Sequence, residues 1–340
     1  MSHKKIILFL LVLIFFAASY SHAVYKPEYK LSVVVGPTGP WGEAAAKFAS
    51  IVKEKSGGKI NIKPYYNGQL FSGKQTNEVL LLKLGVADLA LGSTINWSTT
   101  IKELNLFSLP FMFSNYRELD AVLDGKVGKQ LASIMEQKGV IALAWGENGF
   151  RELTNSRKKI VSPSDLDGLK IRVVGSPIFI DIFKSLGANP ASINWSEALT
   201  ALQQGTVDGQ ENPINSVIIP YKLWQMQNNI LIWHYAIDPI IFGISKAIWN
   251  SFSKKDQEII LNAAKETAVW QKAQARKGLD KSTESLDILR KNGMDVVVLS
   301  GKERQAFKEK TKSVYEKWRK EIGASLVDEV EKEIKGATKK

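Results

Sequence analysis

The chain has 340 residues, of which 44% are hydrophobic and 24% charged, and its formal net charge is +12. These proportions are those of an ordinary globular protein. Because single cores stop growing beyond roughly 250–300 residues, two core units are expected. With no cysteine and 3 histidines, disulfide scaffolds, Cys/His zinc sites and most histidine- or cysteine-based catalysis are excluded. A mechanism that uses only carboxylates stays open.

Residues 1–23 have the pattern of a secretory signal peptide. Two lysines precede an apolar run over 6–16, and Ser21-His22-Ala23 fits cleavage after Ala23. The run is well short of the roughly 20 residues that span a bilayer, and no cysteine follows it for lipid attachment. We therefore predict a free protein of the periplasm.

The mature chain stays basic, because 44 of the 46 Lys and Arg remain beside 34 Asp and Glu, a net charge of +10. A basic excess suits a nucleic acid, a membrane surface or an anionic ligand. Export and the lack of any run of five or more basic residues make nucleic acid the least favoured partner.

Strands and helices alternate along the chain, which predicts βαβ units and mixed, mostly parallel sheets. The predicted strands are 30–35, 60–65, 86–91, 140–145, 169–174 and 294–299, and the predicted helices are 41–55, 76–84, 116–123, 127–138, 178–186, 195–204 and 302 to the end. The alternation restarts near residue 150, so two α/β lobes are expected. Residues 254–291 contain one glycine, Gly278, and no proline. They predict a long helix, or two broken near Gly278, that braces both lobes.

Ligands of parallel α/β sheets bind beyond the carboxyl ends of the strands, which directs attention to residues 36–41, 92–98, 146–151, 172–176 and 210–213. Two arginines stand out, because a guanidinium can hold a carboxylate with two hydrogen bonds. Arg172 lies in an apolar strand, and Arg151 follows Phe150. For either arginine, an ion pair with an Asp or Glu of the same chain is at least as common a role. Residues 209–213 are predicted to form a turn between a strand and a helix, where Asn212 suits a carboxylate or hydroxyl, or a helix N-cap.

Trp41, Trp97 and Trp195 fall where predicted strands lead into helices. Such a tryptophan packs in the core, or covers the apolar face of a ligand while its N–H finds a polar partner. No glycine-rich phosphate fingerprint occurs at these junctions.

Four segments are similar to one protein family: GLKIRV at 168–173, EALTALQQGTVDGQENP at 197–213, NIKPYYNGQL at 61–70 and LPF at 109–111. They resemble the DctP-like solute-binding subunits of tripartite ATP-independent periplasmic (TRAP) transporters, and the likeness covers essentially the whole mature chain. The resemblance implies a two-lobed α/β periplasmic-binding fold, type II-like. Lobe I would comprise 24–148 plus 238–278, and lobe II 149–237 plus 279–340. It implies a monomer that binds a carboxylate and delivers it to small and large membrane subunits for ion-gradient-driven uptake, with no cofactor, metal or enzyme activity.

The resemblance also implies roles for single residues. The arginine that binds the ligand carboxylate corresponds to Arg172, a second arginine to Arg151, the site asparagine to Asn212 and a stacking aromatic residue to Trp195. A loop that lines the pocket in relatives corresponds to four residues, and four more complete the predicted ligand-binding set: Ser93, Thr94, Asn96 and Trp97, then Gln75, Ser176, Trp41 and Asp238.

The ligand is predicted only as a class. Sialic-acid binders of the family carry Glu in place of Ser93, so a smaller acid is expected. We place sugar acids such as uronates or aldonates first, a C4-dicarboxylate or keto acid next and an aromatic acid third. Two other functions stay open: a periplasmic enzyme that uses Glu147, Glu197 and Glu211, and a signalling protein that docks on a sensor when loaded.

Overall fold

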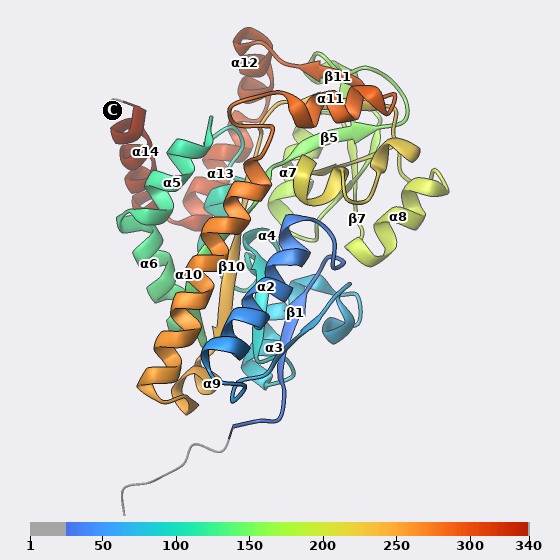
Figure 1. Ribbon diagram of the computed structural model, residues 1–340. Coiled ribbons are helices and arrows are strands. Elements are labelled where there is room, and N and C mark those ends of the chain that lie inside the picture. Colours follow the sequence, from blue (N-terminus) through green and yellow to red (C-terminus); the bar gives the residue numbers. More distant parts are fainter. Residues whose placement is uncertain (1–24, 339–340) are drawn as a thin grey trace, which may run out of the picture.

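The computed structural model describes residues 25–338 (Figure 1), so the predicted signal peptide and its cleavage site lie outside the described residues. The chain forms two mixed β-sheets with helices packed around them, which confirms the predicted two-lobed α/β fold. We call the part around the five-stranded sheet lobe I and the part around the six-stranded sheet lobe II.

The sheet of lobe I has the order β2 (Ile62–Tyr65), β1 (Tyr29–Val33), β3 (Leu89–Ser93), β10 (Ile237–Ser245) and β4 (Val140–Phe150). β1 is parallel to both of its neighbours, whereas β10 is antiparallel to β3 and β4. β10 is buried along its whole length. The sequence analysis did not predict it, and Pro239 within it is unusual for a central strand. A register shift between Asp238 and Pro239 accommodates the proline.

The sheet of lobe II has the order β11 (Asp295–Val298), β9 (Asn229–Ile232), β5 (Glu152–Asn155), β8 (Gly209–Asn212), β6 (Lys170–Val173) and β7 (Asn189–Ser192). β5 is antiparallel to β9 and β8, and the other pairs are parallel. The prediction of a turn at 209–213 was wrong, because residues 209–212 form the buried strand β8. Its polar side chains bond other buried side chains: Gln210 bonds Thr154 of β5, Glu211 bonds Arg151, and Asn212 bonds Gln210.

The helices lie on the faces and between the lobes: α2 (Gly39–Lys55), α3 (Glu78–Leu84), α4 (Thr94–Trp97), α5 (Tyr116–Asp124), α6 (Lys126–Gln137), α7 (Pro177–Ser185), α8 (Trp195–Gln203), α9 (Lys246–Ser251), α10 (Lys254–Arg276), α11 (Glu284–Lys291), α12 (Gly301–Lys310), α13 (Lys312–Ile322) and α14 (Ala324–Thr338). Several of these helices begin with the N-capping side chains that are typical of helix starts. Ser253 caps α10 by accepting from the N–H of Asp256, and Ser300 and Glu303 form a capping box on α12.

The predicted segment 254–291 is two helices, as the second alternative stated, because the chain turns at Gly278 with φ of +71°. α10 packs beside α2 and on β4 in lobe I (Figure 1). At its end, the Asn215 side chain of lobe II donates to the carbonyls of Ala275 and Lys277, at 3.0 and 2.7 Å. The helix therefore connects the two lobes.

The C-terminal helices also contact both lobes. α13 packs on α7 of lobe II, while α14 packs on α5 and α6, and α6 lies against β4 of lobe I. The residues at which one lobe ends and the other begins stay a prediction.

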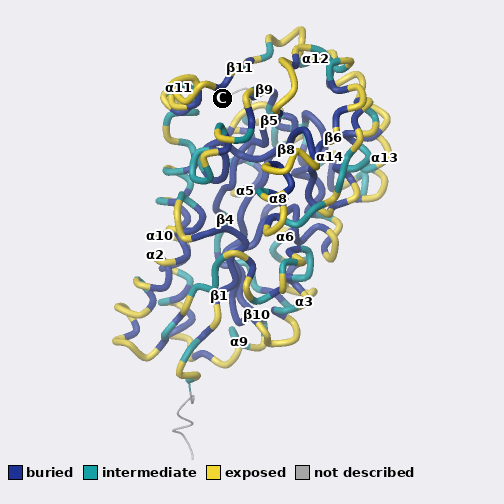
Figure 2. The backbone as a smooth tube through the Cα atoms, turned by 90° about the vertical axis from the view of Figure 1, so that its right-hand side faces the viewer, coloured by how far each residue is buried: buried dark blue, intermediate teal, exposed yellow. Residues whose placement is uncertain are grey.

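Two segments of the chain cross from one lobe to the other, and these crossovers lie side by side. Residue 151 connects β4 to β5, and residues 233–236 connect β9 to β10. The N–H of Arg151 donates to the carbonyl of Ala236 at 3.0 Å, and the N–H of Phe111 donates to the carbonyl of Tyr235 at 2.7 Å. The largest apolar cluster runs through this region from one lobe into the other, and the tube drawing shows the buried centre continuing between them (Figure 2).

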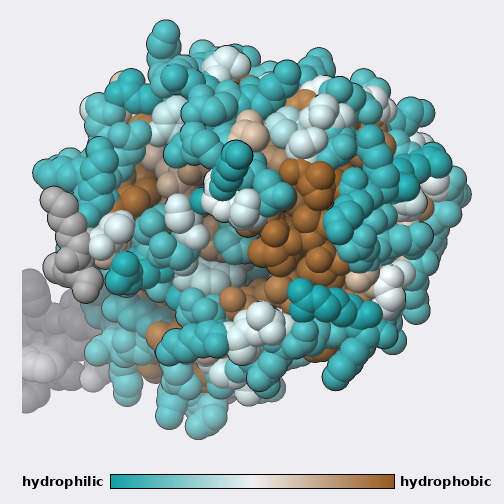
Figure 3. Space-filling model, turned by 90° about the horizontal axis from the view of Figure 1, so that it is seen from above, coloured by the Kyte–Doolittle hydropathy of each residue, from teal (hydrophilic) through white to brown (hydrophobic). Residues whose placement is uncertain are grey.

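The outer surface is mainly hydrophilic. Seen from above, hydrophobic side chains gather in a hollow right of the centre of the molecule (Figure 3). Across residues 25–338, no helix combines the length and the apolar character needed to cross a membrane.

Lobe I contains a buried carboxylate that titrates close to neutral pH. Glu78 on α3 is 1% exposed and accepts from Ser32 Oγ at 2.5 Å and from Trp97 Nε1 at 2.8 Å. Burial raises the pKa of Glu78 from 4.5 to about 7. Between these values the folded protein holds a proton that the unfolded chain has lost, so stability falls as the pH rises.

We expect Glu78→Gln to be more stable than the wild type at pH 8, by up to roughly 3 kcal/mol, and equal to it near pH 4.5. The amide can still accept from Trp97 and bond Ser32, while the cost of ionisation is removed. Denaturant unfolding across this pH range measures the effect. The pKa of Glu147 is also raised to about 7 by burial, and Glu147 is present in both proteins. The measurement therefore compares how steeply the free energy of unfolding changes with pH in the variant and in the wild type. Identical slopes would contradict the assignment.

Candidate functional site

A small cavity lies between the lobes. Nine of the predicted site residues line it: Trp41, Gln75, Ser93, Asn96, Arg151, Arg172, Trp195, Asn212 and Asp238. The other lining residues, which the sequence analysis did not name, are Val34, Val35, Asn148, Val174 and Val217. Val34 and Val174 directly follow β1 and β6. Val174 falls in the predicted segment 172–176, whereas Val34 lies inside the predicted strand 30–35, since β1 ends two residues earlier than predicted. A larger groove between residues 110–112 and α12 to α14 contains no predicted site residue.

Arg172 is a buried cation without a carboxylate partner. It lies on β6, is 1% exposed, and donates from Nε to the carbonyl of Ile193 at 2.8 Å. Its Nη2 has no hydrogen-bond partner among the described residues, and no carboxylate within 25–338 forms a salt bridge with it. The ring of Trp195 lies 5.6 Å from the guanidinium. Burial lowers the pKa of Arg172 to about 10, so it stays charged at neutral pH and is available to an anion.

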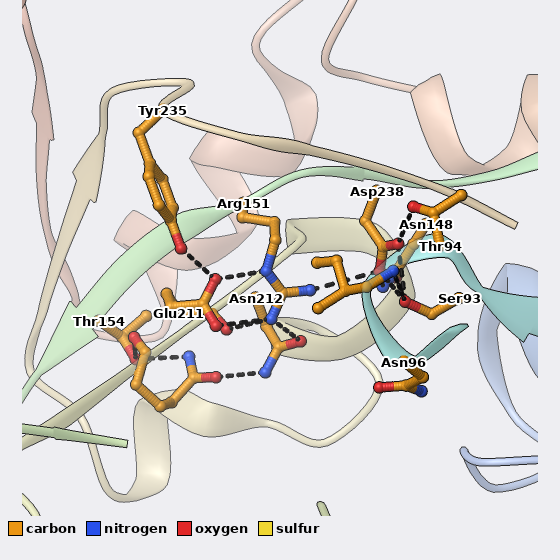
Figure 4. Close-up of polar contacts among 12 residues, drawn as sticks. Ser93, Thr94, Asn96, Asn148, Arg151, Thr154, Glu211, Asn212, Tyr235 and Asp238 are labelled. Atoms are coloured by element: carbon orange, nitrogen blue, oxygen red, sulfur yellow. Dashed lines mark hydrogen bonds and ion pairs between the residues drawn. The ribbon is translucent and has the colours of Figure 1, made fainter. Parts of the chain in front are cut away.

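Arg151 is, in contrast, fully paired (Figure 4). It forms a salt bridge through Nε with Glu211, and its Nη2 donates to Glu211 Oε1 at 2.8 Å and to Asn212 Oδ1 at 3.2 Å. Tyr235 donates to the other oxygen of Glu211 at 2.6 Å. Burial alone would lower the pKa of Arg151, but the charge of Glu211 outweighs it and raises the pKa. The intramolecular pair that the sequence left open as an alternative is therefore present.

Asp238 supplies a second carboxylate at the cavity wall. It accepts from Ser93 Oγ at 2.7 Å, Thr94 Oγ1 at 3.0 Å and Asn148 Nδ2 at 2.8 Å, and Arg151 Nη1 lies 3.5 Å away. Figure 4 shows these side chains grouped around Asp238, with Arg151 between it and Glu211. Burial raises the pKa of Asp238, against the opposing effect of Arg151. Asn148 Oδ1 has no hydrogen-bond partner in the described part of the chain.

Gln75 links the two walls of the cavity. Its Nε2 donates to Asn96 of lobe I at 2.7 Å, and its Oε1 accepts from the backbone N–H of Trp195 at 2.7 Å. That N–H lies at the start of α8 in lobe II, where the backbone leaves donors unpaired. Trp41 closes another wall and donates from Nε1 to the carbonyl of Leu91 at 2.9 Å. The lobes are thus in contact around the cavity.

Three predicted site residues lie elsewhere. Thr94 supports Asp238 from behind the wall. Trp97 is fully buried in the core, where its indole N–H is bound to Glu78, so the predicted ligand stacking does not fit its position. Ser176 Oγ lies 3.1 Å from Ser98 Oγ and donates to Asn105 Oδ1. It contributes to the contact between the lobes instead of the cavity.

The three glutamates of the enzyme alternative also lie outside the cavity lining as the described residues form it. Glu147 pairs with Arg276 at 2.6 Å, Glu211 pairs with Arg151, and Glu197 is exposed on the first turn of α8. Among residues 25–338, no group of three or more His, Cys, Asp or Glu is arranged to hold a metal ion.

The family model of bacterial extracellular solute-binding protein family 7, DctP, matches residues 31–321. The chain belongs to the DctP family. Members of this family are the substrate-binding proteins of TRAP transporters, which bind small carboxylates and work with membrane subunits. The family and its solved neighbours are transport proteins.

Several DctP relatives with stated ligands are similar to this chain. A TRAP solute-binding protein of Ralstonia eutropha with bound (S)-2-hydroxy-2-methyl-3-oxobutanoate is 45% identical, with a TM-score of 0.91 over 92% of this chain and 100% of its own. A sugar-acid-binding protein of Advenella mimigardefordensis in complex with galactonate is 32% identical, with a TM-score of 0.85 over 91% and 98%. The C4-dicarboxylate-binding protein DctB of Bacillus subtilis is 30% identical over 89% and 85%.

The two arginines of this DctP protein should respond oppositely to replacement. Arg151→Met leaves Glu211 buried without its cation, which typically costs about 3–5 kcal/mol of stability. Arg172→Met removes a cation that has no carboxylate partner among the described residues, so stability should be unchanged or increased. Denaturant unfolding of both variants, freed of ligand by dialysis under partial unfolding, measures this. Equal losses would contradict the distinction.

Proposed function

We propose that this protein captures a small hydroxy or keto acid in the periplasm and delivers it, as a monomer, to the membrane subunits of a TRAP transporter. The observation that carries the proposal is the buried guanidinium of Arg172, whose Nη2 lacks a partner among the described residues. A ligand carboxylate would supply the missing acceptor with the two-bond geometry that guanidinium favours. The proposal treats the protein as a carrier and not as an enzyme.

The unpaired charge also accounts for closure. Burying an ion without a partner costs several kcal/mol, so without ligand the closed form is disfavoured and the lobes open to hydrate Arg172. A bound carboxylate removes this cost and touches both lobes, which gives it the differential affinity for the closed form that drives closure. The Gln75 bridge between Asn96 and Trp195 then forms.

The cavity wall favours a compact acid with a branched apolar part. The cavity is small and is lined by side chains of both lobes. Val34, Val35, Val174 and Val217 line it and suit methyl groups. The Ralstonia eutropha relative holds an acid of this kind. We therefore place branched hydroxy or keto acids before the sugar acids that the sequence analysis placed first.

Sugar acids are the second candidate, because the cavity also carries the side-chain amides of Gln75, Asn96, Asn148 and Asn212. Each amide can donate and accept, which suits several hydroxyls. The relative from Advenella mimigardefordensis was solved with galactonate.

A thermal-shift screen separates the two candidates. We expect 2-hydroxy-2-methyl-3-oxobutanoate, 3-methyl-2-oxobutanoate or pantoate to raise the melting temperature by several degrees, because a ligand at 100 times its Kd stabilises by about 2.7 kcal/mol. Acetoin, which lacks the carboxylate, is the matched control and should have no effect. A larger shift with galactonate or erythronate would favour the sugar acids, and no shift with any acid would contradict the proposal.

Arg172→Gln should abolish binding of whichever acid the screen identifies, since losing one partner of a buried charged pair costs about 3–5 kcal/mol. Calorimetry measures it. Arg157→Gln is the control, because Arg157 is an exposed arginine of lobe II that pairs with Asp208, and it should bind normally. Micromolar affinity retained by Arg172→Gln would contradict the role of Arg172.

Gln75→Ala should weaken binding by roughly tenfold, because it removes two hydrogen bonds of the closed form, to Asn96 and to the N–H of Trp195. Each such bond contributes about 0.5–1.5 kcal/mol. The exposed Gln204 at the end of α8 provides the control, Gln204→Ala. Titration calorimetry compares the two variants. Unchanged affinity in Gln75→Ala would show that the bridge does not contribute to the ligand-bound state.

A further inference from the structure

The charges at the cavity have a specific balance. Arg172 and Arg151 carry two positive charges, and Glu211 and Asp238 carry two negative charges. Glu211 holds Arg151 through Nε and Nη2, so the charge of Arg151 is already compensated. Arg172 alone has no carboxylate partner among the described residues. The site therefore offers one free positive charge.

Asp238 contributes a negative charge that faces the ligand space. It lines the cavity and is 1% exposed. Ser93, Thr94 and Asn148 hold its carboxylate in place with neutral donors, which orient it without cancelling its charge. The nearest cation, Arg151, approaches only through Nη1 at 3.5 Å.

Arg172 and Asp238 come from different lobes. Arg172 lies on β6 of lobe II, and Asp238 lies on β10 of lobe I. Both residues line the same small cavity, so an acid whose carboxylate binds Arg172 shares this cavity with Asp238. Both side chains are 1% exposed, and between like charges that are shielded from water the repulsion is strong.

We infer that Asp238 restricts the site to acids with a single carboxylate and excludes dicarboxylates of the same length. The inference rests on the proposed function, because it takes Arg172 as the anchor of the first carboxylate. A second carboxylate would meet Asp238 and would find Arg151 already engaged by Glu211. A hydroxyl or amide group at the same place can donate to Asp238, or to Asn148 Oδ1, which has no partner among the described residues, without that repulsion.

Malate and its 4-amide, malamate, test this directly. They have the same size, shape and 2-hydroxyl group, and differ only in the charge of the distal group. By calorimetry at pH 7.5 we expect the wild type to bind malamate roughly tenfold or more tightly than malate. Asp238→Asn should reduce this ratio by roughly tenfold, mainly through tighter binding of malate. Asp295→Asn is the control, since Asp295 is an exposed carboxylate of β11 and its loss changes the net charge equally.

The outcomes distinguish a failure of the role of Asp238 from a failure of the proposed function. Equal binding of malate and malamate by the wild type, or an unchanged ratio in Asp238→Asn, would overturn the inference and leave the proposed function standing. A wild type that binds no acid of the screen would overturn both. If Asp238→Asn does not fold, the ratio measured on the wild type alone still decides, because it compares ligands and not variants.

Discussion

The ion pair between Arg151 and Glu211 is the interaction on which both the fold and the site depend. Arg151 is the single residue that joins β4 to β5, so its backbone belongs to a crossover and its side chain to the sheet of lobe II. Glu211 on β8 also accepts from Tyr235 of the second crossover. One buried carboxylate therefore binds side chains of both crossovers, at residue 151 and at residues 233–236. The guanidinium that it neutralises forms part of the cavity wall.

The contrast between the two arginines explains how one site can be stable and still respond to a ligand. Arg151 is compensated within the chain, so its burial supports the folded state. Arg172 is buried on a neighbouring part of the same wall with its Nη2 unpaired among the described residues, and in the proposed function its burial becomes favourable only when an anion binds. This difference gives a ligand carboxylate a larger effect on the closed form than on the open form, which is the requirement for ligand-driven closure.

Much of the fold was predictable because alternating strands and helices with short connections leave few arrangements. The strands at 30–35 and 169–174 and the helix at 41–55 appear within a few residues of their predicted bounds. The errors lie where tertiary contacts override local pattern. β8 was predicted as a turn between a strand and a helix, yet residues 209–212 pair with β5 and β6 and their polar side chains have buried partners. β10 carries a proline that only a bulge between neighbouring strands can accommodate.

The sequence by itself determined the two-lobed architecture, the family and most of the cavity wall, because strand ends and family motifs are local features of the chain. The family resemblance matched Arg172 to the ligand arginine, but only the tertiary structure showed that Arg151 is paired within the chain. Both guanidiniums had the same two interpretations in the sequence, and the outcome depended on whether a carboxylate from a distant strand, Glu211 or Asp238, lay within reach. It also placed Trp97 in the core beside Glu78, since a fixed spacing cannot show which face of a short helix is covered. Pairing between residues far apart in the chain is a property of the packed state, and so is the charge that the cavity presents to its ligand.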